Sequence, residues 1–148
     1  MRPTTLAEVG KRVSSGEAIA KVLAEFLDEF YAGSTIEAAA AMLQEEPPAT
    51  GDDFQDALLA AVADYLSMQY VREPPPSWAR APARFLDRPY FTTPVDTPAA
   101  KAWLMHSSPA EFKFHNIFTE ARPLRRKLSE HPRWTQRPDA ELDAPFRP

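Results

Sequence analysis

The chain has 148 residues, of which 44% are hydrophobic and 26% are charged, and these proportions are typical of a globular domain and argue against disorder of the whole chain. It has no cysteine, which excludes disulfides, thiolate metal sites and a cysteine nucleophile. No apolar run approaches the ~20 residues that span a bilayer, and the first residues form an amphipathic segment rather than the apolar core of a signal peptide. We therefore expect a cytoplasmic protein.

The net charge of −4 is divided unevenly along the chain. Residues 1–73 carry 5 Lys or Arg against 13 Asp or Glu, whereas residues 74–148 carry 12 against 8. Only 3 of the 16 prolines precede residue 74. Two interpretations remain open: the two halves attract each other within one fold, or the second half presents a basic surface to a partner.

Apolar side chains at three- and four-residue spacing predict four helices in the first half. Thr5 and Glu8 have the spacing of a capping box at the start of the first helix, and the same spacing recurs from Ser14 and from Ser34 before the next two. Gly33 is expected to end the second helix in a left-handed conformation. The predicted helices are 6–14, 17–32, 35–46 and 53–70.

The second half is predicted to consist of shorter elements separated by prolines. Thr97 as N-cap and Pro98 as the first helical residue introduce one helix, in which Trp103 and Leu104 are expected to face inward. The predicted helices here are 98–106, 109–115 and 122–128. Only the run from Tyr90 to Thr93 could be extended.

The expected fold is all-α: a single-domain bundle of about five to seven helices, with a Pro-rich irregular arm in its second half. The domain is predicted to cover residues 1–130. Residues 131–148 contain four prolines and little apolar periodicity, so we expect an irregular C-terminal tail there.

Residues 78–91 form the pattern W-x(3)-P-x-R-F-L-D-x-P-[WY]-F, and residues 25–32 and 107–112 add to it. Together they resemble an uncharacterised bacterial all-α domain that occurs alone or beside helix-turn-helix modules and near toxin–antitoxin-like genes. The resemblance implies a helical fold and carries over no catalytic residue. The chain departs from it at Phe114, His115 and Asn116, where a basic cluster followed by glycine is expected.

The same stretch can be interpreted from its residues alone. A Pro-rich segment cannot pair its backbone N–H and C=O groups through helical hydrogen bonds. Its large aromatic side chains are therefore expected to anchor it as an arm on the helical core. Charged residues of the arm could hold it through side-chain hydrogen bonds. The alternative is a partner-binding patch. The candidate interaction arm comprises Trp78, Arg84, Phe85, Asp87, Arg88 and Phe91.

The sequence contains no recognisable catalytic or cofactor motif. Its four glycines are isolated, so it has no Gly-rich phosphate loop and no glycine-flanked nucleophile. His106, Glu111 and His115 form the one histidine–carboxylate cluster worth naming as a metal site, although a pair four residues apart is more often a surface pair. We predict no catalytic, cofactor or metal residues.

Four basic residues, Arg122, Arg125, Arg126 and Lys127, form the candidate nucleic-acid patch, since basic side chains near an aromatic could track phosphates. The tail beyond them also carries acidic residues, so a solvated basic face is the favoured interpretation. The leading functional hypothesis is a non-enzymatic protein-interaction or regulatory module, antitoxin-like, that pairs with another protein or with itself, without a membrane. The alternatives are nucleic-acid binding and an unrecognised metal-dependent enzyme.

Overall fold

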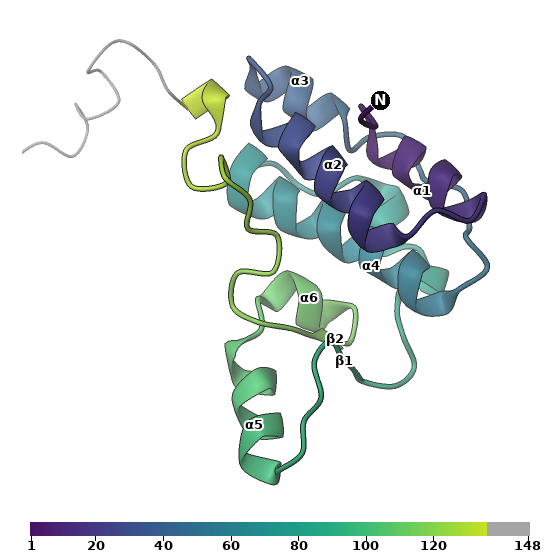
Figure 1. The fold of residues 1–148 in the computed structure, drawn as a ribbon, viewed down its shortest axis with the longest axis vertical. Coiled ribbons are helices and arrows are strands. Elements are labelled where there is room, and N and C mark those ends of the chain that lie inside the picture. Colours follow the sequence, from purple (N-terminus) through teal and green to yellow (C-terminus); the bar gives the residue numbers. More distant parts are fainter. Residues whose placement is uncertain (136–148) are drawn as a thin grey trace, which may run out of the picture.

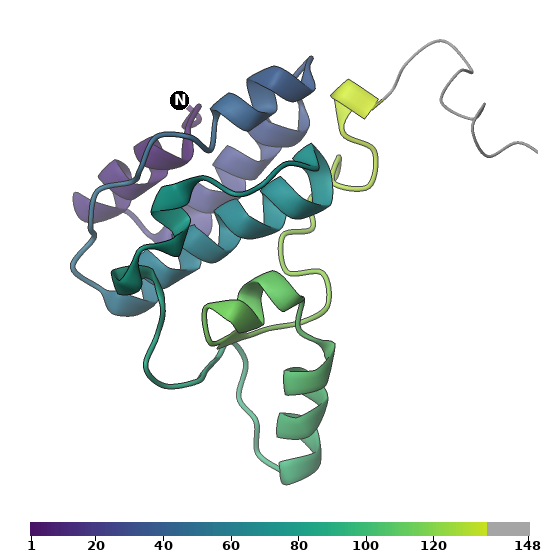
Figure 2. The ribbon, with the colours of Figure 1, turned by 180° about the vertical axis from the view of Figure 1, so that it is seen from behind.

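A computed structural model describes residues 1–135 of the chain. Within them, four helices form the body: α1 (Leu6–Ser14), α2 (Ile19–Tyr31), α3 (Ile36–Ala41) and α4 (Asp53–Leu66). Helix α4 lies at the centre, with α1, α2 and α3 over one side of it (Figure 1). The opposite view shows the chain after α4 returning across its other side (Figure 2). Because α4 is enclosed in this way, most of its residues are buried.

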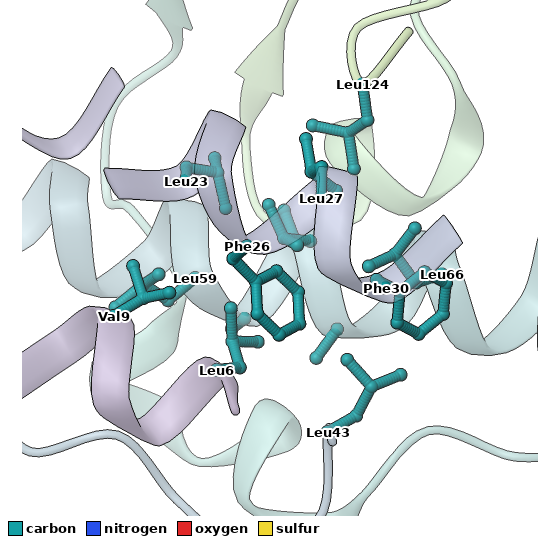
Figure 3. Packing of buried hydrophobic residues seen from close by; sticks show 14 of the residues in the cluster. Leu6, Val9, Leu23, Phe26, Leu27, Phe30, Leu43, Leu59, Leu66 and Leu124 are labelled. Atoms are coloured by element: carbon teal, nitrogen blue, oxygen red, sulfur yellow. The ribbon is translucent and has the colours of Figure 1, made fainter. Parts of the chain in front are cut away.

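The core is built from the apolar stripes that the sequence predicts. Leu6 and Val9 of α1 meet Phe26 and Phe30 of α2 above the central helix, and Leu43 closes one side (Figure 3). These side chains are almost completely buried. Burial of each large apolar side chain contributes roughly 1.5–3 kcal/mol, so this cluster is the main source of stability.

The helix boundaries confirm some predictions and correct others. Helix α1 has the predicted bounds, and the Thr5 hydroxyl accepts a hydrogen bond from the amide of Glu8 at 3.1 Å. Helix α2 starts at Ile19, two residues later than predicted, and its N-cap Ala18 offers no side chain as a cap. Helix α3 ends at residue 41 rather than 46, because the chain passes into turns before the two prolines at 47 and 48.

Two capping predictions are wrong. Gly33 does not have a positive φ, and α2 ends at Ala32 in a right-handed conformation. Thr35, rather than Ser34, caps α3, and its hydroxyl accepts from the amide of Ala38 at 3.1 Å. Both threonine and serine can cap a helix, so spacing alone could not choose between neighbours.

The predicted helix 53–70 has the right extent but changes its winding. After Leu66 the chain continues as a π-helical turn, Ser67–Val71, in which the Arg72 amide donates to the Ser67 carbonyl at 2.7 Å. Arg72 then stops the helix with φ of +65°. Such π turns are rare and occur often at functional sites.

The arm that follows consists of two 3₁₀ turns, Ser77–Arg80 and Pro82–Arg84, both packed on α4. It leads into a short strand, β1 (Tyr90–Phe91), which pairs in parallel with β2 (Ile117–Phe118). The fold is therefore mostly helical, as predicted, but the described residues also hold a two-stranded sheet that the all-α prediction omitted.

Between the two strands lie α5 (Pro98–Ser107) and α6 (Ala110–Phe114), close to their predicted bounds. The predicted helix 122–128 is wrong, because this stretch forms turns. The Ser129 hydroxyl bonds both the amide and the carbonyl of Arg126, and such local bonds compete with helix formation. Part of the expected irregular tail forms a 3₁₀ turn, Arg133–Thr135, and residues 136–148 of it lie outside the described residues.

Candidate functional site

Helix α5 projects away from the helical body (Figures 1 and 2). The Thr97 hydroxyl caps its start by accepting from the Ala100 amide at 3.0 Å, and Pro98 is its first residue, both as predicted. Of its ten residues only Leu104 is buried. Packing therefore holds α5 at its base, while the rest of the helix faces solvent.

Hydrogen bonds fix the base of this projection. The Ser108 hydroxyl oxygen lies 2.6 and 2.8 Å from the carbonyl oxygens of Leu104 and Thr119, which share its single hydrogen, and it accepts from the Thr119 amide at 2.8 Å. The Lys113 ammonium donates to the His106 carbonyl at 3.1 Å. Because Thr119 directly follows β2, these bonds tie the C-terminal end of α5 to the end of the parallel strand pair. The projecting helix is held in a defined orientation.

The exposed surface of α5 is unusually apolar. Trp103, which was predicted to face inward, is 69% exposed, and Met105 is also exposed. The prediction failed because the apolar spacing in this short helix does not distinguish a face that packs on the body from one that faces outward. A largely exposed indole on a projecting helix is the strongest sign of an interaction surface in residues 1–135.

The candidate arm is anchored to the body by two buried side chains, an arginine and a tryptophan. The Arg84 guanidinium donates to the carbonyls of Pro47 and Asp56, at 2.7 and 3.0 Å, and lies over the Trp78 ring at 4.9 Å. The Trp78 indole N–H donates to the Leu43 carbonyl at 3.0 Å. These two residues hold the arm against α4 and against the turns that follow α3.

The other candidate arm residues are more accessible. Phe85 stacks on His115 with the ring centroids 4.5 Å apart, and Phe91 stacks on Phe118 at 5.4 Å. Asp87 and Arg88 are exposed. The arm therefore divides into an anchored part and an exposed turn, and the anchored part leaves little surface for a partner.

A buried histidine–aspartate pair, which sequence analysis missed, joins the arm to α4. His115 Nδ1 lies 2.7 Å from the carbonyl oxygen of Arg84, and Nε2 lies 2.5 Å from Oδ2 of Asp64. Both side chains are almost completely buried, and the Arg80 guanidinium lies 3.5 Å from the other carboxylate oxygen. One signal was present in the sequence: Asp64 follows Ala57 and Ala61 by seven and three residues, on the buried stripe of α4.

This pair has no position at which it could act on a substrate. A carbonyl oxygen only accepts hydrogen bonds, so Nδ1 of His115 must carry a hydrogen, and a further hydrogen bridges Nε2 and the Asp64 carboxylate. Both ring nitrogens are thus engaged inside the protein. General-base catalysis needs a free nitrogen within reach of a substrate proton, so we assign the pair a structural role.

The next residue, Asn116, adopts φ of +66°. Asn116 belongs to the stretch where the resemblance leads to an expectation of a basic cluster followed by glycine. Asparagine is among the few side chains that readily take this left-handed conformation. Its amide also donates to the Leu86 carbonyl at 3.1 Å, which adds a second tie between the arm and the end of α6.

The three residues of the proposed metal cluster do not meet. His115 is engaged as described, and Glu111 accepts a hydrogen bond from the Gln69 amide at 3.0 Å. His106 is exposed on α5. Throughout residues 1–135 no group of three or more histidine, aspartate or glutamate side chains is placed to hold a metal ion.

Two of the four basic residues of this segment are paired with carboxylates. Arg126 makes two hydrogen bonds of 2.8 Å to the Asp28 carboxylate of α2, and Arg122 pairs with Glu130. The hydrogen bond from Arg126 lowers the pKa of the Asp28 carboxyl. Lys127 is exposed. The four residues therefore do not form one continuous phosphate-tracking surface.

Comparisons with models of known protein families, with curated proteins and with solved structures give no match. The helices found in residues 1–135 lack the combination of length and apolar character that a bilayer crossing requires.

Proposed function

We propose that this protein is a non-enzymatic interaction module that presents α5 to a protein partner. The observation that carries the proposal is Trp103, 69% exposed on a helix whose base is hydrogen-bonded in place. Tryptophan is enriched among the side chains that dominate binding energy at protein interfaces, where it fills an apolar pocket and its N–H finds an acceptor. The expected partner is a folded protein with an apolar cleft.

A regulatory or antitoxin-like role follows from the resemblance rather than from the geometry. Such a factor would bind its partner through a preformed element, and a fixed helix lowers the entropy lost on binding. The buried His115–Asp64 pair has a structural role in this proposal, because neither ring nitrogen is available to a substrate.

The proposal is tested by co-expression with the products of neighbouring genes, followed by titration of each purified pair. Trp103→Ser is expected to weaken the complex by about tenfold or more, as a central aromatic anchor does. Met68→Ser is the matched control, because Met68 is also an exposed apolar side chain but lies on the π turn.

A second copy of the chain is the other partner to be examined, by light scattering across a concentration series. Loss of self-association in Trp103→Ser would support α5 as the interface. A protein that stays monomeric and forms no complex with any neighbouring product would contradict the proposal. Equal weakening by the two substitutions would also contradict it, since the binding surface would then not be α5.

A further inference from the structure

A small polar pocket lies between the end of α4 and the C-terminal turns. Tyr65, Gln69 and Tyr70 form one wall, and Arg122, Arg125 and Glu130 form the other. Its volume is about 280 Å³, and it opens to solvent. This volume is near the lower limit of small-molecule sites, which span about 300–1,000 Å³, so the pocket suits one compact ligand.

The aromatic wall depends on the π turn. The widened turn over Ser67–Val71 carries Gln69 and Tyr70 into the pocket beside Tyr65, whose ring centroid is 6.3 Å from that of Tyr70. The planes of the two rings are inclined by 57°, so a flat ligand can stack on one ring and meet the other with its edge. Both rings also pack on the body: the Tyr70 ring centroid lies 5.1 Å from that of Tyr31, and the Tyr65 centroid lies 5.6 Å from that of Phe112.

Polar groups with unused hydrogen-bonding capacity line the same space. Within residues 1–135 the Tyr65 hydroxyl has no hydrogen-bond partner, and burial raises the pKa of that phenol, which keeps it a donor. Gln69 gives one amide hydrogen to Glu111, at 3.0 Å, and its amide oxygen makes no bond in the described part of the chain. These groups can form hydrogen bonds with the polar atoms at the edge of an aromatic ring of a bound ligand.

The charges favour an anion. Arg122 is paired with Glu130, which cancels two of the three charges in the wall. Arg125 has no carboxylate partner among the described residues, although the neighbouring Arg126 is paired with Asp28. A guanidinium is the side chain best suited to bidentate binding of phosphate oxygens.

We propose that this pocket binds a nucleoside phosphate, with the phosphate at Arg125 and the base against the Tyr65–Tyr70 wall. An aromatic platform combined with an arginine is the arrangement by which proteins hold unpaired nucleotides. The volume admits one nucleotide, which is either a free mononucleotide or one unit of a single strand. The proposal does not depend on α5 or on the function proposed for it.

The test is an NMR titration of the full chain with AMP, with adenosine and inorganic phosphate as partial probes. AMP is expected to perturb the signals of the pocket residues saturably, and more tightly than either partial probe. Arg125→Gln is expected to raise the Kd about tenfold or more, because it removes charge-assisted hydrogen bonds to the phosphate. Lys127→Gln is the matched control, since it removes the same charge from an exposed side chain outside the pocket.

Two outcomes would overturn the proposal: no saturable change in the pocket at millimolar AMP, or equal weakening of AMP binding by Arg125→Gln and Lys127→Gln. Both arginine and lysine here are exposed, so both variants should fold, which circular dichroism checks. A parallel titration with a single-stranded oligonucleotide of about eight residues separates the sources. If the oligonucleotide binds more tightly than AMP, in a salt-dependent way that also requires Lys127, the natural ligand is a nucleic acid. If AMP and the oligonucleotide bind with equal affinity, the natural ligand is the free nucleotide.

Discussion

Removing both partners of the buried Asp64–His115 pair should destabilise the fold no more than removing either partner alone. In Asp64→Leu, the hydrogen that bridges the pair keeps no acceptor, and His115 stays buried. In His115→Phe, the carboxylate keeps only Arg80, at 3.5 Å and half exposed. Breaking one side of a buried pair costs about 3–5 kcal/mol, and Arg80 places the His115→Phe value near the lower figure.

The double variant replaces both polar groups by apolar groups of similar volume, so no charge stays buried and unpaired. What remains is the Arg84 carbonyl, which loses the hydrogen bond from Nδ1, at about 1–3 kcal/mol. The double variant should thus be about as stable as either single one. The interaction energy of the mutant cycle is expected to be about 3 kcal/mol, the upper end for contacting residues.

Urea denaturation of the four proteins, followed by circular dichroism, measures these values. Additive effects would refute the argument, because they would mean that the two side chains do not depend on each other in the folded state. A cost below about 1 kcal/mol for each single variant would refute it as well, since such a value is typical of an exposed pair.

Three further predictions concern other parts of the molecule. Gly10→Ala should lower the free energy of unfolding by about 1–2 kcal/mol in a urea titration, because the new Cβ would lie 2.7 Å from Cβ of Pro47. This clash should outweigh the better helix propensity of alanine. A variant more stable than the wild type would contradict the prediction. Arg126→Gln should cost about 0.5–1 kcal/mol at pH 7. The hydrogen bond from Arg126 lowers the pKa of Asp28 in the folded protein. The stability difference between the wild type and Arg126→Gln should therefore be full above the ordinary aspartate pKa of about 3.9 and disappear as the pH falls through the folded pKa of Asp28. A stability difference that does not change with pH would contradict the assignment. Trp103→Ser should change stability by no more than about 0.5 kcal/mol by thermal unfolding, and a larger loss would mean that α5 packs on the body.

Local signals predicted the elements whose ends depend on nearby residues. The capping threonines at 5 and 97 lie where the sequence predicts them, because a cap involves only atoms within one turn. Gly33 shows the limit of such signals. A glycine permits a left-handed stop without requiring one, and here the helix ends in a right-handed turn.

The candidate site was predicted only in part. The aromatic, proline-rich arm was expected, together with the two ways it could be used. That Arg84 would brace it by bonding carbonyls at residues 47 and 56 depends on the meeting of segments far apart in the chain. The same holds for the pairing of Arg126 with Asp28, which neutralises one member of a basic run in the sequence.

The sequence by itself determined that this chain is helical, where its first helices run and which stripes they bury, since hydrophobic spacing and capping act within a few residues. Only the tertiary structure decided that His115 meets Asp64, that Trp103 faces solvent and that Tyr65 and Arg125 line one pocket. The physical reason is that a side chain's environment is set by whatever other segment packs against it. Periodicity along one helix shows that a face is apolar but not whether anything covers it.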